Sequence, residues 1–183
     1  DLMAITAAAS AGITVFGENR VQEAIDKFSR FGSIFPSTID LIGSLQMNKV
    51  KKTVGFFNLI HSIDSIQLAE KVEAEAVRKL RIQSILVQVN IGEEAVKRGV
   101  SIKDFPYLID AVSNFPHLKL MGLMAIPPKA TNPRAYFSKL RKLGESFGLT
   151  RLSIGMSSDF EVAIEEGASW VRVGTAIFGE RSD

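Results

Sequence analysis

Two apolar runs near the carboxyl terminus of the chain end in residues that could hold an anion. Ser157 follows the run 151–156, and Gly174 and Thr175 lie in the run 170–177. Glycine lets backbone N–H groups approach a ligand closely, and hydroxyl groups donate further hydrogen bonds. The spacing therefore predicts that Ser157, Gly174 and Thr175 converge on one anion such as a phosphate group. Helix capping by Ser157 and strand-end packing of the other two residues are the structural alternatives.

Arg172 stands in an otherwise apolar stretch, WVRVG at 170–174, where a buried strand is predicted. A buried guanidinium must be paired or hydrogen-bonded. Because arginine stays protonated and offers no acceptor, a ligand group that faces it must be an acceptor, such as an unprotonated ring nitrogen or a carboxylate. The alternative is a structural ion pair with a carboxylate on a neighbouring strand, for which Glu18 is a candidate.

Other polar residues follow the earlier apolar runs. Asn19 ends the first run and either caps the next helix or contacts a ligand. His61 lies within an apolar run and is predicted to be a satisfied core histidine rather than a catalytic base. A basic cluster is typical of a solvated helix face, and it consists of Lys49, Lys51 and Lys52.

The composition of the 183 residues excludes several kinds of site. There is no cysteine, which excludes disulfides, thiolate zinc sites and cysteine nucleophiles, and two histidines argue against a multi-histidine metal site. The net charge of +2 is too small to favour nucleic acid or membrane partners. No apolar run approaches the roughly 20 residues that span a bilayer, and the first residues show no signal-peptide pattern. A cytoplasmic location is expected.

Alternating strands and helices must position these residues. Several apolar runs are nearly continuous, as expected for strands buried on both faces, and the predicted strands are 13–19, 38–45, 56–63, 84–91, 118–126, 151–156 and 170–177. Segments with helical periodicity are 2–11, 20–31, 46–54, 65–80, 101–114, 133–147 and 158–167. Strict alternation predicts βαβ units and a parallel sheet.

The chain opens with a helix, which we interpret to mean that a strand precedes Asp1 in the natural protein. With that strand added, the fold is an α/β (β/α)8 TIM-type barrel in a single domain over 1–183. A doubly wound open sheet is the alternative, but no Gly-x-Gly-x-x-Gly turn follows an early strand. In the barrel, 151–156 and 170–177 become strands seven and eight, whose following loops commonly bind phosphate.

Local signals mark some boundaries between elements. Asn132-Pro133 is a helix cap followed by proline at the first helical position. The segment from Ser158 to Glu161 is typical of a capping box, which would leave Ser157 available to a ligand. The segment 127–132 (PPKATN) is predicted to be a mobile loop.

Nearly the whole chain resembles the YggS/PROSC family of pyridoxal 5′-phosphate (PLP) homeostasis proteins, which is related to the N-terminal barrel of alanine racemase. The most specific matching stretches are IGSLQMNK (42–49), GMSSDFEVAI (155–164) and VRVGTAIFG (171–179). The resemblance implies an alanine racemase N-terminal-domain-like barrel that binds PLP and serves PLP homeostasis in the cytoplasm. A monomer is expected by default, and PLP-dependent apoenzymes are candidate partners.

The resemblance assigns a role to each candidate residue. Ser157, Gly174 and Thr175 would hold the PLP phosphate, Arg172 would face the pyridine nitrogen, and Asn19 would lie close to the ring. The family carries its Schiff-base lysine on an N-terminal strand with a VSK-type motif, so that lysine is expected upstream of the first residue of this chain. The family usually has a histidine before its IGxLQ stretch, at the place that Asp40 occupies here.

A carrier or regulator is favoured over an enzyme, with no catalytic residue expected. A cationic Arg172 at the ring nitrogen would keep that nitrogen unprotonated, which weakens the ring as an electron sink. A PLP-dependent racemase or decarboxylase on the same barrel is the alternative. It would need an acid–base pair at the strand ends, whereas Tyr107 and Tyr136 lie in helical segments. A phosphate-binding barrel isomerase unrelated to PLP is a more remote alternative.

Overall fold

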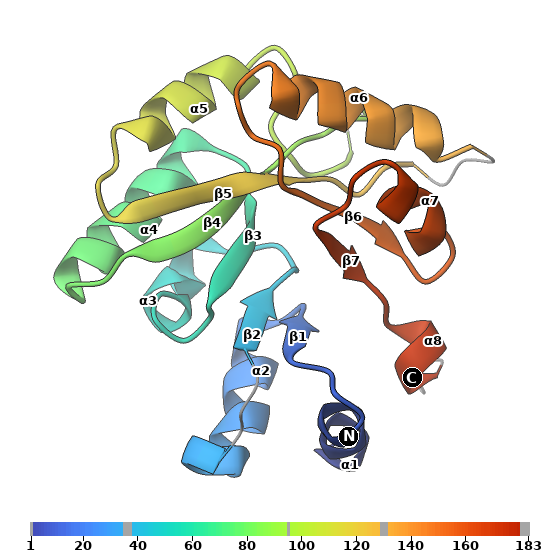
Figure 1. Ribbon diagram of the computed structural model, residues 1–183. Coiled ribbons are helices and arrows are strands. Elements are labelled where there is room, and N and C mark those ends of the chain that lie inside the picture. Colours follow the sequence, from blue (N-terminus) through green and yellow to red (C-terminus); the bar gives the residue numbers. More distant parts are fainter. Residues whose placement is uncertain (1, 35–37, 95, 129–131, 180–183) are drawn as a thin grey trace.

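A computed structural model describes residues 2–34, 38–94, 96–128 and 132–179, and its sheet contains the seven predicted strands. All are parallel and hydrogen-bonded in sequence order. The sheet curls into a nearly closed barrel with helices on its outside (Figure 1). The strands are β1 (Val15–Glu18), β2 (Thr38–Leu41), β3 (Leu59–Ile63), β4 (Gln83–Gln88), β5 (Leu118–Met124), β6 (Leu152–Met156) and β7 (Trp170–Arg172). The eighth strand stays a prediction.

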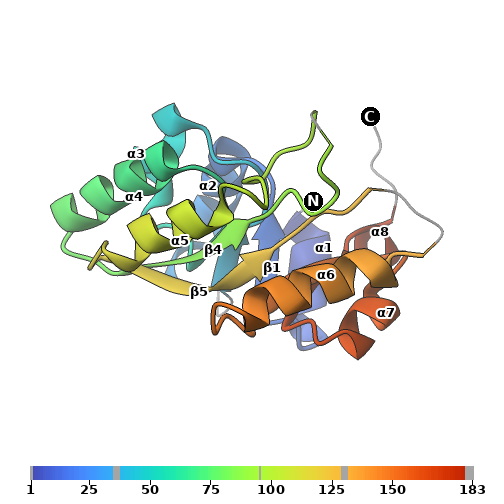
Figure 2. The same ribbon diagram turned by 90° about the horizontal axis from the view of Figure 1, so that it is seen from above.

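The predicted helical segments are confirmed, with ends that differ by a few residues. Helices α4, α5 and α6 lie along the outer side of β4 and β5, as the view from above also shows (Figure 2). The helices are α1 (Leu2–Ser10), α2 (Val21–Phe28), α3 (Val50–Thr53), α4 (Ile66–Arg78), α5 (Phe105–Ser113), α6 (Arg134–Glu145), α7 (Phe160–Glu165) and α8 (Thr175–Phe178). There are also two 3-10 helices, η1 (Ser29–Ile34) and η2 (Met47–Lys49). None of the described helices is long and apolar enough to cross a membrane.

The two faces of the curled sheet are packed differently, because successive side chains of a strand point to opposite faces. The outward residues join the helices in one large apolar core, which includes Ile60, Ile85 and Ile154. A separate small cluster on the inner face contains Leu59, Leu86 and Met124, with Met121 and Trp170 packed against it. The inner face also carries buried polar side chains, which belong to the candidate site.

Three expectations about element ends are wrong. The run 170–177 is not one strand, because β7 ends at Arg172 and α8 begins at Thr175. Ser158 does not head a capping box, since Asp159 is the residue before α7 and its Oδ1 accepts a 2.6 Å bond from the Met156 N–H. Asn19 is not the cap of α2, which begins after Arg20.

The two remaining predictions concern the helix cap before α6 and the loop that precedes it. Asn132 Oδ1 accepts a hydrogen bond from the Arg134 N–H at 3.1 Å, but the cap residue of α6 is Pro133 and the helix begins at Arg134, one residue later than predicted. The centre of the predicted mobile loop, 129–131, lies outside the described residues.

Gly43 allows the carboxyl ends of β1 and β2 to approach each other. A Cβ at this position would lie 2.0 Å from the Asn19 carbonyl oxygen and 2.6 Å from its Cα, and these backbone atoms cannot move away cheaply. The Gly43 N–H also donates to the Glu18 carbonyl oxygen at 3.2 Å. A glycine is therefore required where Asn19 leaves the sheet.

We expect Gly43→Ala to lower the free energy of unfolding by about 1–3 kcal/mol, the usual cost of overpacking. Urea denaturation measures the change. Gly174→Ala is the matched control and should stay near the wild-type value, because a Cβ there meets no described atom within 4 Å. Equal stabilities of the two variants would contradict the close approach at Gly43.

Candidate functional site

The structure brings Ser157 and Gly174 together at the carboxyl ends of β6 and β7. The Gly174 N–H donates to Ser157 Oγ at 3.1 Å, and Thr175 follows as the first residue of α8. Gly174 and Thr175 are exposed, and the space that a side chain would occupy at Gly174 is free of described atoms. Because Ser157 Oγ accepts this bond, its own hydrogen remains available to a ligand. We call Ser157, Gly174 and Thr175 the strand-end group.

Arg172 reaches into the barrel next to the strand-end group. Its Nη1 donates to the Ser153 carbonyl oxygen at 2.8 Å and to Ser153 Oγ at 2.7 Å, and its Nη2 donates to the Ala125 carbonyl oxygen at 2.9 Å. These bonds use three of the five guanidinium N–H groups, so donors remain for a further acceptor. The suggested ion pair with Glu18 is wrong, because Glu18 pairs with Lys27 at 2.6 Å.

The charge of Arg172 survives its burial. Loss of solvent lowers the pKa of the Arg172 guanidinium to about 10, and the negative charge of Asp159 opposes that shift. This pKa lies far enough above neutrality that the side chain remains a cation. Any ring or carboxylate that binds here meets a positive charge with little water around it.

Ser153 connects Arg172 to two further buried side chains, and this connection was not predicted from the sequence. His61 Nδ1 lies 2.9 Å from Ser153 Oγ, and His61 Nε2 lies 3.4 Å from Asp40 Oδ2. The prediction that His61 is a satisfied core histidine is confirmed, since it is 2% exposed and bonded through both ring nitrogens. We call Asp40, His61, Ser153 and Arg172 the inner polar layer.

The His61 imidazole is neutral near pH 7. Burial lowers its pKa below the ordinary value of 6.5, the nearby Asp40 carboxylate opposes the shift, and the Arg172 charge adds to it. The Trp170 ring stands edge-on to the imidazole, with centroids 6.0 Å apart.

Asn19 and Asp64 occupy the ends of two other strands. Asn19 is exposed after β1, and no described hydrogen bond joins its side chain to the strand-end group or to Arg172. Asp64 directly follows β3, a position that could have marked it in the sequence. Burial raises the pKa of the Asp64 carboxyl group, and Arg98 opposes that shift.

The donors at these strand ends can bind an anion or another hydrogen-bond acceptor. No group of three potential metal-ligating side chains occurs among the described residues. Within the same part of the chain, every buried side-chain nitrogen or oxygen has a hydrogen-bond partner.

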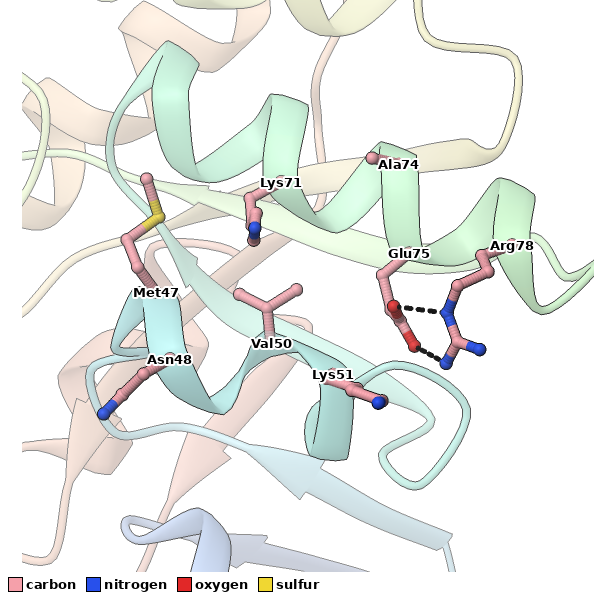
Figure 3. Close-up of a pocket in the computed structure, with 8 residues that line it drawn as sticks. All are labelled: Met47, Asn48, Val50, Lys51, Lys71, Ala74, Glu75 and Arg78. Atoms are coloured by element: carbon pink, nitrogen blue, oxygen red, sulfur yellow. Dashed lines mark hydrogen bonds and ion pairs between the residues drawn. The ribbon is translucent and has the colours of Figure 1, made fainter.

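A surface groove of about 510 Å³ lies elsewhere, between η2–α3 and α4 on the outside of the barrel (Figure 3). Arg78 at one end donates to both oxygens of Glu75, at 2.9 and 2.6 Å. None of the strand-end residues lines this groove, so it is separate from the candidate site. Its lining residues are Met47, Asn48, Val50, Lys51, Lys71, Ala74, Glu75 and Arg78.

The fold is a parallel α/β barrel, and the strand-end group lies after β6 and β7. The chain matches the family described as alanine racemase, N-terminal domain, over residues 1–182. It is 43% identical over 185 residues to the pyridoxal phosphate homeostasis protein of Aquifex aeolicus, covering 94% of this chain and 79% of that protein. The corresponding protein of Escherichia coli K12 is 36% identical, with 97% and 80% covered. The chain therefore belongs to the YggS/PROSC family of PLP homeostasis proteins, within the alanine racemase N-terminal-domain group.

Solved structures agree with this assignment. PipY of Synechococcus elongatus, solved with PLP bound, is 38% identical, with a TM-score of 0.90 and coverage of 97% of this chain and 87% of PipY. Alanine racemase of Clostridium difficile has a TM-score of 0.79 at 12% identity, over all of this chain and 49% of the racemase. At that identity, the likeness to the racemase concerns the fold alone.

The neutral His61 should make stability depend on pH. The unfolded chain binds a proton near the ordinary pKa of 6.5, whereas the folded imidazole resists protonation. The free energy of unfolding should therefore be unaffected by His61 above that pH and fall as the pH drops below it, by up to about 1.4 kcal/mol per pH unit.

Urea denaturation between pH 7.5 and 5, values chosen to bracket the ordinary histidine pKa, tests this dependence. His61→Gln should lose this part of the slope, while His117→Gln leaves the buried histidine in place and should keep it. An identical slope in wild type and His61→Gln would show that the imidazole is protonated in the folded state.

Proposed function

We propose that this chain binds PLP at the carboxyl ends of its strands and serves intracellular PLP homeostasis. The observation that carries the proposal is the bond between the Gly174 amide and the Ser157 hydroxyl next to the partly buried Arg172. Two further facts support it: the relatives are named PLP homeostasis proteins, and the PipY structure contains PLP.

In this proposal the strand-end group holds the phosphate. The Ser157 hydroxyl, the Thr175 hydroxyl and backbone N–H groups near Gly174 donate hydrogen bonds to its oxygens, and bonds to a charged acceptor are the stronger kind. Arg172 directs an N–H toward the pyridine nitrogen, and Asn19 lies on the ring side. When bound, PLP supplies an aldehyde that reacts with amines and a ring that accepts electrons.

The proposed role is that of a carrier or regulator without classical PLP-enzyme catalysis. The cationic Arg172 can only donate to the ring nitrogen, so that nitrogen stays unprotonated and the ring is a weaker electron sink. A racemase would need an acid–base pair at the strand ends. Tyr107 and Tyr136 instead lie on the outer helices α5 and α6, and Tyr107 is 68% exposed.

The proposal includes the setting of the protein. Residues 1–183 act as one PLP-binding domain, in a cytoplasmic monomer that passes PLP to apoenzymes and has no nucleic acid or membrane partner. The exposure of Gly174 and Thr175 supports loading and release, because a ligand reaches them without a covering segment among the described residues.

Ser157→Ala should weaken PLP binding without unfolding the chain. The lost hydrogen bond to a charged group is worth about 1.5–3 kcal/mol, which corresponds to a rise in Kd of about 10- to 150-fold. Absorbance titration with PLP measures the Kd, and circular dichroism checks the fold. Ser158→Ala removes the adjacent exposed hydroxyl and should bind like wild type. An unchanged Kd in Ser157→Ala would refute the phosphate assignment.

The lysines within residues 1–183 are not expected to bind PLP covalently at this site. Lys97, which follows β4, already pairs with Glu94 at 3.3 Å. After PLP loading and borohydride reduction, peptide mapping of residues 1–183 should find no lysine labelled stoichiometrically. In a longer natural form, the label should fall on a lysine upstream of Asp1. One fully labelled lysine within 1–183 would relocate the site.

A further inference from the structure

The inner polar layer is one continuous chain of hydrogen bonds across the barrel. It runs from Asp40 on β2 through His61 on β3 and Ser153 on β6 to Arg172 on β7. The first three residues are nearly inaccessible, with relative exposures of 4%, 2% and 0%. An apolar cluster and Trp170 pack on the same face of the sheet, so the layer lies in a dry interior where hydrogen bonds are strong.

The chemistry of the four groups fixes the direction of every bond. Arg172 can only donate, so Ser153 Oγ accepts from it and keeps one hydrogen, which it can donate to His61 Nδ1. The Asp40 carboxylate can only accept, so a neutral imidazole carries its proton on Nε2, which faces that carboxylate, and Nδ1 is the acceptor for the Ser153 hydroxyl hydrogen. The chain thus has a cation at one end and an anion at the other.

This layer does not act as a nucleophilic triad, although it contains Asp, His and Ser. The Ser153 hydroxyl is fully buried and already accepts a bond from a guanidinium, so it cannot reach a substrate. Its effect must be exerted on Arg172, the only member that adjoins the strand-end group.

Arg172 is held from two sides. The Ser153 and Ala125 carbonyl oxygens fix its position, and the Ser153 hydroxyl adds the only side-chain contact among the described residues. Without that hydroxyl, the carbonyl bonds would keep the guanidinium nearby but would hold its plane less firmly. The orientation of the remaining N–H groups therefore depends on the rest of the layer.

We propose that Asp40, His61 and Ser153 are positioning residues, which orient the Arg172 guanidinium toward the ring nitrogen of PLP through a hydrogen-bond chain of fixed direction. This inference rests on the proposed function. The inner polar layer sets the hydrogen bond at the ring nitrogen, whereas the strand-end group sets the affinity for the phosphate. The two contributions are therefore separable by mutation.

The direction of the chain is tested first, without PLP. The protein has only two histidines, so long-range 1H–15N NMR spectra of the imidazoles resolve each ring. His61 should be a single tautomer with its proton on Nε2 at pH 7. His117, which is more exposed and pairs with Glu73 at 3.2 Å, provides the internal reference. A His61 ring protonated on Nδ1, or on both nitrogens, would overturn the proposal.

The effect on PLP is tested with cofactor labelled with 15N at the ring nitrogen. In wild type this nitrogen should show the resonance of an unprotonated pyridine. Ser153→Ala should shift the resonance toward pyridinium with a smaller loss of affinity than Ser157→Ala. Ser157→Ala, at saturating PLP, should leave the resonance in place. A wild-type resonance in folded Ser153→Ala would overturn the positioning role.

Variants of Asp40 keep the test decisive if Ser153→Ala does not fold. Asp40→Asn retains an acceptor oxygen for His61 Nε2 and should bind PLP with the wild-type resonance. Asp40→Leu, of similar shape without an acceptor, should shift the resonance as Ser153→Ala does. Identical resonances in Asp40→Leu and wild type would remove Asp40 from the chain. Failure of wild type to bind PLP at all would instead refute the proposed function.

Discussion

The burial of one positive charge, on Arg172, organises the interior of this barrel. An isolated cation in a dry interior costs many kcal/mol, so the surrounding strands must supply acceptors. They do so with two carbonyl oxygens and the Ser153 hydroxyl, and the negative charge of Asp159 also favours the charged guanidinium. Among the described residues no carboxylate accepts a hydrogen bond from Arg172, so some of its N–H groups remain available to a ligand.

The alternation of side chains along parallel strands makes this arrangement possible. One face of the sheet packs under the helices and is largely apolar, which provides stability independent of the site. The other face is then free to carry polar residues, and the neighbours of His61 and Ser153 in sequence, such as Ile60 and Ile154, belong to the outer core. A shift of one residue in any of these strands would exchange the two faces, so the outer core also fixes the register of the inner polar layer.

The sequence predicted what depends on local pattern. Continuous apolar runs and helical periodicity located the strands and helices, and the positions of Ser157 and Gly174 at the ends of adjacent strands indicated that they meet. The inner polar layer was not predicted, because its contacts join residues 21, 92 and 19 positions apart and depend on how far the sheet curls. The short helix α8 was missed for another reason: Gly174 interrupts an apolar run that has no other sign of a break.

The site combines a rigid interior with an open edge, and this contrast bears on what the protein can do with a ligand. The inner polar layer, which is proposed to face the ring through Arg172, is largely buried and mutually bonded, whereas Gly174 and Thr175 are exposed. An enzyme gains rate by excluding water and surrounding the reacting atoms with fixed donors and acceptors. If PLP binds as proposed, a barrel that keeps the ring nitrogen unprotonated and leaves the phosphate group accessible can hold the cofactor in a less reactive form and still release it. The inner polar layer is fixed and the strand ends are accessible. This contrast is the physical reason why the proposed function is that of a carrier rather than an enzyme.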